Sequence, residues 1–174
     1  TGNTITAKIA HGVRAKTISF TFTSDTTKNI EVPNNYKLGV IENKNLDGKL
    51  YSSFSTAVSE ASTGHVLQLW ATNNSWNFNS LEVTKGITLR GNSTASTIID
   101  GGASANAIEI KSNSVTIEDL TLQGSTNSLI FAGSYNNLLL QNLTIGSADS
   151  EYGVYFDGTS SSTINNITVN STDE

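Results

Sequence analysis

Carboxylates are the groups in this sequence best suited to chemistry, and most of them lie in its second half. Residues 81–174 contain ten Asp and Glu residues but only three basic ones, Lys85, Arg90 and Lys111. A polysaccharide lyase needs carboxylates that hold Ca²⁺ and a basic residue that abstracts a proton, whereas a glycoside hydrolase needs carboxylates about 5–9.5 Å apart. The candidate acids are Asp100, Glu109, Glu118, Asp119, Asp149, Glu151 and Asp157.

These acids do not form a convincing catalytic group in the sequence. Glu118 and Asp119 are adjacent, so on a strand their side chains point to opposite faces. The histidines, His11 and His65, are each isolated, which is more typical of a structural or solvent-facing residue. We therefore predict a non-enzymatic protein with no catalytic residue, and a polysaccharide lyase or glycoside hydrolase is the alternative.

Metal and cofactor sites have equally little support. Asp149, Glu151 and Asp157 lie close together among Ser and Gly residues and are weak candidates for a Ca²⁺ site, although a solvated acidic loop is the simpler interpretation. The chain has no cysteine, which excludes disulfides, thiolate nucleophiles and cysteine-based metal sites. We expect no metal site and no cofactor, with Ca²⁺ as the one possible exception.

Two further patterns suggest contact with sugars. Trp70, Trp76 and Phe78 form either a platform for a carbohydrate or, as we expect, the filling of the first layer of the core. The sequence also contains five Asn-x-Ser/Thr acceptors for N-glycosylation. Three of them are the predicted glycosylation sites: Asn73, Asn92 and Asn170.

The element that positions these residues is a repeat. Residues 117–122, 140–145 and 164–169 each read apolar, polar, Asp or Asn, apolar, Thr, apolar, at spacings of 23 and 24 residues. A looser copy at 86–89 precedes the first by 33 residues and is followed by an apparent extra strand at 97–99. Three short strands and three turns give a coil of this length, and such coils stack about 4.8 Å apart. A leucine-rich repeat has a similar period, but its helical segment is missing from these Ser-, Thr- and Gly-rich spacers.

The third position of the repeat predicts a structural ladder. Asp119, Asn142 and Asn166 fall where the chain must bend between strands, and Asp and Asn tolerate the left-handed backbone that such a bend requires. Stacked copies can join their side chains up the column. This role removes Asp119 from the likeliest catalysts and makes Asn142 and Asn166 poor glycosylation sites.

The regions before the repeat predict a cap and an extension. Residues 51–62 form the one convincing helix, with an apolar stripe that includes Phe54 and Val58. Residues 1–50 are predicted to be a separate β extension, and 51–174 to be the repeat domain. A strand in the extension places three apolar residues on one face and is a possible assembly strand: Ile18, Phe20 and Phe22.

The segments 54–58, 64–69, 86–91 and 96–102 resemble the N-terminal part of pectin-lyase-like right-handed β-helices. The resemblance covers 51–174 and implies an all-β, right-handed parallel β-helix of about four to five coils, with an amphipathic helix over its N-terminal end. That superfamily includes polysaccharide lyases, glycoside hydrolases, phage tailspikes, adhesins and surface-layer-type proteins. Lys85, Arg90 and Lys111 match none of its lyase motifs, so the resemblance indicates a fold rather than an activity.

Composition and charge restrict the partners. The acidic second half has no basic stripe for nucleic acid, and no apolar run is long enough to span a membrane. The absence of Cys and Met fits an extracellular or cell-surface protein. The last predicted strand has no capping element, so either the natural protein continues beyond it or the open end is used. Residues 1–80 and 81–174 carry opposite net charge. We therefore expect a homo-oligomer or polymer, formed by strand addition or end-to-end stacking, that serves a filament, appendage, surface layer or adhesin. The alternatives are that the protein binds a polysaccharide or a cell-surface ligand, or that it is a binding module of a larger secreted protein.

Overall fold

The computed structural model describes residues 3–11, 14–22, 40–70, 75–78, 80–146 and 150–170, the first two ranges as strands without their side chains. The chain divides into two units, Thr1–Leu38 and Gly39–Glu174. The division therefore falls before the predicted boundary at residue 50. The reason is that a short hairpin, β3 (Ile41–Asn43) and β4 (Lys49–Tyr51), pairs with the first strand of the second unit.

The first unit contains an antiparallel hairpin of β1 (Asn3–His11) and β2 (Arg14–Phe22). Its register sets Ile5 opposite Phe20 and Ala7 opposite Ile18. The strand predicted around Ile18, Phe20 and Phe22 is therefore present as β2. The remainder of the predicted extension up to residue 39 lies outside the described residues.

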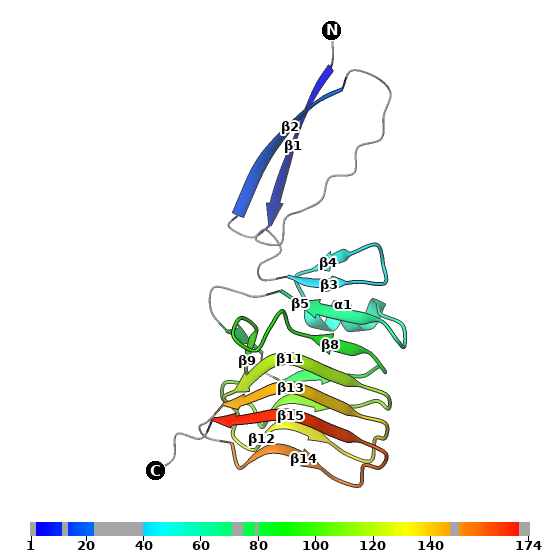
Figure 1. Cartoon of the computed structure of the whole chain (residues 1–174), viewed down its shortest axis with the longest axis vertical. Coiled ribbons are helices and arrows are strands. Elements are labelled where there is room, and N and C mark those ends of the chain that lie inside the picture. The colour runs from blue at the N-terminus through cyan, green and yellow to red at the C-terminus, as the bar shows by residue number, and fades with distance from the viewer. Residues whose placement is uncertain are drawn as a thin grey trace. The chain divides into compact units, whose positions relative to one another are not determined.

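The second unit is a parallel β-solenoid of about four turns (Figure 1), which confirms the predicted all-β parallel β-helix. Its coils are built from β5 (Val66–Leu69), β6 (Trp76–Asn77), β7 (Leu81–Val83), β8 (Thr88–Arg90), β9 (Ile98–Asp100), β10 (Asn106–Ile110), β11 (Thr116–Gln123), β12 (Ser128–Ala132), β13 (Leu139–Gly146), β14 (Tyr152–Phe156) and β15 (Thr163–Asn170).

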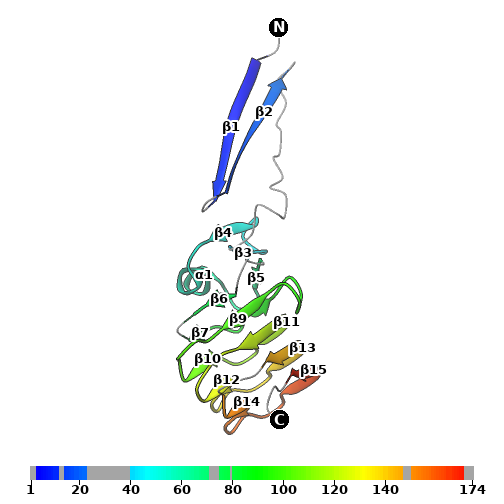
Figure 2. The same cartoon turned by 90° about the vertical axis from the view of Figure 1, so that its left-hand side faces the viewer.

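Two sheets line the solenoid. One has the order β15-β13-β11-β8-β5-β3-β4, and the other has the order β14-β12-β10-β7. Figure 2 shows β10, β12 and β14 stepping along one side of the stack and β11, β13 and β15 along the other. Inward positions form continuous apolar columns, such as Leu89, Ile117 and Leu140, which are all fully buried. Each such side chain stabilises the stack by about 1.5–3 kcal/mol.

The cap is helix α1 (Phe54–Glu60), which is shorter than the predicted helix at 51–62. Tyr51 belongs to β4, and Ser53 is the N-cap because its hydroxyl accepts a hydrogen bond from the Thr56 N–H. Ala61 is already extended. The helix buries Phe54, Ala57 and Val58 and packs against β3 and β7. No helix in the described part of the chain is long and apolar enough to cross a membrane.

The register of the early coils corrects one feature of the repeat. β8 pairs with the first half of β11, with Leu89 opposite Ile117, and β9 pairs with the second half, with Ile99 opposite Leu122. The predicted alignment of 86–89 with the second half was therefore wrong, and the strand at 97–99 is not an extra one. The physical reason is a loop at 91–97, which is inserted where later coils make only a bend.

Candidate functional site

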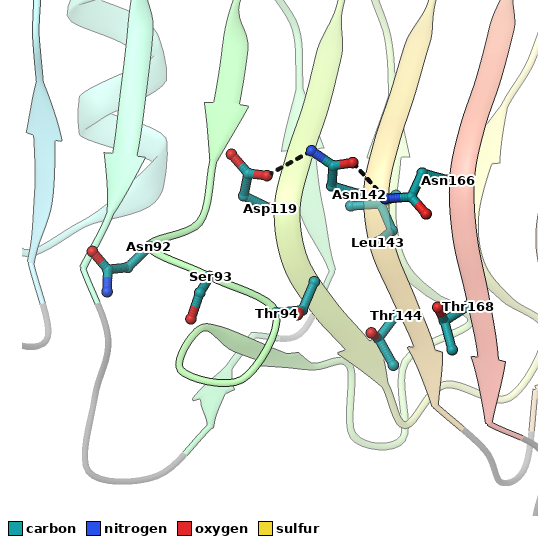
Figure 3. Close-up of a pocket in the computed structure, with 9 residues that line it drawn as sticks. All are labelled: Asn92, Ser93, Thr94, Asp119, Asn142, Leu143, Thr144, Asn166 and Thr168. Carbon is teal, nitrogen blue, oxygen red and sulfur yellow. Dashed lines mark hydrogen bonds between the residues drawn. The ribbon is translucent and has the colours of Figure 1, made fainter.

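The predicted side-chain ladder runs along the bend of the solenoid. Asp119, Asn142 and Asn166 have left-handed backbone, with φ of 59°, 51° and 50°. Asn142 Nδ2 donates to Asp119 Oδ1 at 3.0 Å, and Asn166 Nδ2 donates to Asn142 Oδ1 at 2.8 Å (Figure 3). The Asp119 carboxylate is thus a member of this ladder, as its place in the repeat predicts.

A shallow groove of about 420 Å³ lies over the ladder. The inserted loop forms one wall with Asn92, Ser93 and Thr94, and Thr144 and Thr168 lie opposite (Figure 3). The Thr121 hydroxyl donates to the Thr94 carbonyl at 2.7 Å and so fastens the loop to β11. Asp119 is the only ionisable residue among those that line the groove. The groove therefore presents hydroxyls, amides and one hydrogen-bonded carboxylate, an arrangement suited to contact with polar groups.

A second ladder, which the sequence reasoning missed, lies at the turn before β11, β13 and β15. Asn136 N–H donates to Asn113 Oδ1 at 2.8 Å, and Ser160 N–H donates to Asn136 Oδ1 at 2.8 Å. The residue after each of these is left-handed: Ser114, Asn137 and Ser161. Their spacing is the same 23 and 24 residues as in the first ladder. That spacing was the available signal. Ser at two of the three left-handed positions, residues 114 and 161, concealed it.

The Glu118 side chain lies on the outer side of the sheet but is buried there, and each of its carboxylate oxygens has a polar partner. One carboxylate oxygen forms an ion pair with Arg90, and the other accepts a hydrogen bond from Gln141 Nε2 at 2.6 Å. Only 6% of the residue is exposed. Its two oxygens hold three neighbouring coils together, so the structure gives this predicted acid a positioning role in the stack.

Asp100 and Glu109 are partly buried and also have polar partners. Asp100 accepts hydrogen bonds from Gln123 Nε2 at 3.0 Å and from a backbone N–H at 2.9 Å. Lys111 lies 3.3 Å from Glu109 and 2.7 Å from Glu82. The hydrogen bond to Glu82 raises the pKa of Lys111, which keeps its ammonium protonated at neutral pH. A lysine with a raised pKa is less often in the neutral form that accepts a proton.

Of the three acidic residues predicted as weak Ca²⁺ candidates, the structure describes two. Glu151 and Asp157 are exposed, at either side of β14, and Asp149 lies outside the described residues. Across the residues that the structure describes, no group of three or more His, Asp or Glu side chains is placed to hold a metal ion.

The aromatic residues predicted as a sugar platform or core filling belong to the core. Trp70 and Trp76 are each only 9% exposed. Trp76 stacks on Phe78, with ring centroids 5.4 Å apart. The ring centroids of Phe78 and of Phe54 in the cap helix are 6.0 Å apart. These rings fill the first coil beneath α1.

A different aromatic surface faces solvent on β12 and β14. The rings of Tyr152 and Tyr155 stack with their centroids 5.0 Å apart, and the two residues are 41% and 39% exposed. Phe131, from the coil before, lies 5.7 Å from Tyr155. These three residues are called the aromatic surface below. Sequence reasoning missed it, although Tyr155 occupies an outward position of a strand whose Val154 and Phe156 face the core.

Tyr152 offers a direct check on the geometry of this surface. A hydrogen bond with Glu151 raises the pKa of the Tyr152 phenol. We expect Glu151→Gln to lower it, so that one of the five tyrosines ionises at lower pH in an ultraviolet absorbance titration. Tyr152→Phe is the control and should remove this titrating group. An unchanged titration in Glu151→Gln would show that the two side chains do not interact.

The predicted glycosylation sites differ in accessibility. Asn92 is exposed in the inserted loop, and Asn170 is exposed at the end of β15, whereas Asn73 lies outside the described residues. The side-chain nitrogens of Asn142 and Asn166 donate within the ladder. A glycan on either of these nitrogens would replace one of its two hydrogens and place a sugar against the ladder.

The open end of the solenoid is the other distinctive surface. We use that term for the outer edges of β14 and β15, which pair with no further strand in the described part of the chain. Ile164 and Val169 of β15 are 50% and 68% exposed, although they continue columns of buried residues. No protein family, curated protein or solved structure matches this chain. Function is therefore inferred from the surfaces of the solenoid itself.

Proposed function

We propose that the protein is a non-enzymatic structural subunit that assembles with further copies through the ends of its solenoid. The observation that carries this proposal is the exposure of Ile164 and Val169. Their counterparts one coil earlier, Leu140 and Ile145, are 0% and 4% exposed. Among the described residues, the last coil thus exposes side chains in core positions and a strand edge without a partner strand, and such an edge favours pairing with another strand.

The proposed lack of enzymatic activity is supported by the engagement of the candidate acids. Asp119 is in the ladder, Glu118 is paired with Arg90, and both oxygens of Asp100 accept hydrogen bonds. Glu118 and Asp100 thus have both carboxylate oxygens engaged, which leaves neither oxygen free to reach a substrate, and Asp119 has one oxygen in the ladder. These three residues instead connect successive coils or close a turn.

An extracellular position, as a module of a filament, appendage, surface layer or adhesin, belongs to the same proposal. The chain contains neither Cys nor Met, the side chains most easily oxidised. Its sequence resembles pectin-lyase-like β-helices, a superfamily that includes adhesins and surface-layer-type proteins. Exposed Asn92 and Asn170 are suitable acceptors for a surface glycan.

The proposal is tested by following the size of the purified full chain over a concentration series. We expect light scattering to rise above a threshold concentration and electron microscopy to show linear polymers. A chain that stays monomeric throughout the series contradicts the proposal. Depolymerisation of an acidic polysaccharide by the same preparation would overturn the non-enzymatic part of it.

We also predict that sodium chloride weakens assembly. Residues 1–80 contain seven basic and five acidic residues, whereas 81–174 contain three basic and ten acidic ones. Attraction between such oppositely charged regions is screened beyond about 10 Å at 0.1 M salt and about 3 Å at 1 M. The threshold concentration for assembly should rise severalfold between these conditions. An unchanged threshold would show that charge does not contribute.

A second candidate function, carbohydrate binding, is supported by the aromatic surface. Exposed, stacked rings such as Tyr152 and Tyr155 offer flat apolar faces that suit the C–H face of a sugar. Affinity electrophoresis in gels that contain soluble polysaccharides tests it. If a polysaccharide retards the protein, Tyr152→Ala with Tyr155→Ala should abolish the effect, while Glu82→Ala, on the same sheet but on β7, should not. Equal retardation of all three proteins would contradict this candidate.

A further inference from the structure

We infer that the cavity between the cap helix and the first coil binds a small neutral sugar of one or two rings. The cavity is separate from the open end and from the aromatic surface, so this inference goes beyond both proposed functions and rests on neither. Four observations support it: the apolar floor of the cavity, its serine hydroxyls, the backbone of Ser80 and the charges at its rim.

The cavity has the size of a small-molecule site. Its volume is about 510 Å³, and it lies where α1 begins beside β7, two elements that pack against each other. Sites for small molecules are usually clefts of about 300–1,000 Å³ with apolar walls and a few polar groups. All of its described lining residues belong to the cap and the first coil.

The floor of the cavity is apolar and held in place by packing. It is formed by Phe54, Phe78 and Leu81, of which Phe54 and Leu81 are only 6% and 2% exposed. The ring planes of Trp76 and Phe78 differ by 10°, and those of Phe78 and Phe54 by 52°. Aromatic rings fixed in this way offer apolar contact to the C–H groups of a sugar ring with little loss of side-chain entropy on binding.

Serine hydroxyls from the start of the cap form part of the cavity wall. Ser52 and Ser55 are exposed, and the hydroxyl oxygens of Ser53 and Ser55 are 3.0 Å apart. A serine hydroxyl both donates and accepts hydrogen bonds, as does each hydroxyl of a sugar. A set of such groups therefore suits a ligand with several hydroxyls.

Ser80, in the connection between β6 and β7, also lines the cavity and has an unusual backbone. Its φ of 79° is left-handed, a conformation that glycine adopts with less strain. Its hydroxyl oxygen is buried and has no hydrogen-bond partner among the residues that the structure describes. Backbone strain is concentrated at functional sites, and a buried unpaired hydroxyl requires an explanation of its own. A sugar hydroxyl in the cavity would supply the partner after a change of the Ser80 rotamer.

The charges at the rim favour an uncharged ligand. Glu82 is the only ionisable residue in the described lining, and its carboxylate lies 2.7 Å from the Lys111 ammonium group. Lys111 also lies 3.3 Å from Glu109, so one ammonium group is shared between two carboxylates and the net charge of the three residues is −1. A uronate would therefore be repelled, and a carboxylate that is already paired with Lys111 attracts an amine only weakly.

Ligand-observed NMR of the full chain tests the inference with defined probes. The neutral probes are the methyl glycosides of glucose, galactose, mannose and N-acetylglucosamine, together with cellobiose and lactose, and the charged probes are galacturonate and choline. We expect saturation transfer to at least one neutral sugar, with a dissociation constant on the order of 1 mM and about tenfold weaker binding of both charged probes. Saturation transfer to no neutral sugar, or tighter binding of a charged probe, overturns the inference.

Ser80→Gly separates a binding role from a structural one. The substitution removes the hydroxyl and relieves the left-handed strain, so we expect about tenfold weaker sugar binding together with an unchanged or higher melting temperature. The matched control is Ser114→Gly, the same substitution at another left-handed serine, with φ of 58°, that does not line the cavity. It should leave the affinity unchanged. Equal affinities of Ser80→Gly and the natural protein overturn the placement of the sugar beside Ser80.

A second variant removes hydroxyls from the cap and keeps the helix intact. Ser52→Ala with Ser55→Ala changes two exposed residues, while Ser53 continues to accept the hydrogen bond from the Thr56 N–H. We expect an unchanged circular dichroism spectrum and a severalfold loss of affinity for the sugar. An unchanged affinity would exclude this wall from the binding site and overturn the inference.

The tyrosine variant distinguishes the cavity from the aromatic surface. Tyr152→Ala with Tyr155→Ala leaves the cavity unaltered and should bind the sugar as the natural protein does. Affinity that is lost in this variant and kept in the serine variants would place the sugar on the aromatic surface and overturn the cavity as its site. Because none of the cavity serines belongs to the open end, the test of assembly is independent of either result.

Discussion

Gly91→Ala is expected to destabilise the solenoid by about 3 kcal/mol, which corresponds to a fall of roughly 10 °C in melting temperature for a chain of this size. A Cβ at residue 91 would lie 2.1 Å from the carbonyl oxygen of Asp119 and 2.8 Å from the Leu120 Cβ. The nearest atom belongs to the backbone, so it cannot move aside without shifting β11. Gly91 itself donates its N–H to the Glu118 carbonyl at 2.9 Å, which fixes the two coils at this separation.

Gly133→Ala is the matched control for this prediction. Nothing lies within 4 Å of a Cβ at residue 133, and we expect a change of about 0.5 kcal/mol or less. Thermal unfolding followed by circular dichroism, at a concentration below the assembly threshold, compares the two variants. Equal melting temperatures would mean that the coils at residues 91 and 119 are not in close contact.

Gly91 also explains why the repeat was aligned wrongly in one coil. The register places Arg90 opposite Glu118, so residue 91 is at the bend where the later coils have Asp119 and Asn142. The sequence pattern of residues 87–89, apolar, Thr, apolar, fits either half of a coil, because inward and outward positions alternate in both. Only the pairing between distant strands reveals that the insertion lies at the bend.

The features that could be predicted are those determined by local chemistry. The period of the coils follows from the spacing of apolar residues, and the ladder follows from Asp and Asn at positions that need left-handed backbone. The second ladder needs the same left-handed backbone, but two of its left-handed residues are Ser114 and Ser161. Because the chain is rich in Ser, these two residues do not stand out from the rest of the sequence.

The features that could not be predicted depend on contacts between distant parts of the chain. Residues 41–51 are a turn-rich passage in the sequence, and only the pairing of Ile41 with Leu69 makes them part of the solenoid. Trp76 and Tyr155 are both aromatic residues on strands. One lies beneath the cap and the other on an outer face, and this difference depends on what packs over each strand.

Asn142→Ala is expected to destabilise the protein by about 3 kcal/mol, the second large effect. The substitution removes two ladder hydrogen bonds, each contributing about 0.5–1.5 kcal/mol, and leaves a non-glycine residue at φ 51°, which costs about 1–2 kcal/mol without a local hydrogen bond. Urea unfolding of the dilute protein measures the free energy. Asn165→Ala, a change of an exposed residue beside the ladder, is the control and should alter it by about 0.5 kcal/mol or less.

Two further variants separate the contributions to this ladder. Asn142→Gly removes the same hydrogen bonds but accepts the left-handed backbone freely, so its cost should be only about 1–2 kcal/mol. Asn166→Ala removes one ladder hydrogen bond instead of two, and its cost should lie between those of Asn142→Ala and the control. Equal losses in Asn142→Ala and Asn142→Gly would mean that the hydrogen bonds alone stabilise the bend. Because each rung joins neighbouring coils, a graded series would show that stability is distributed along the stack, coil by coil, as in other repeat proteins.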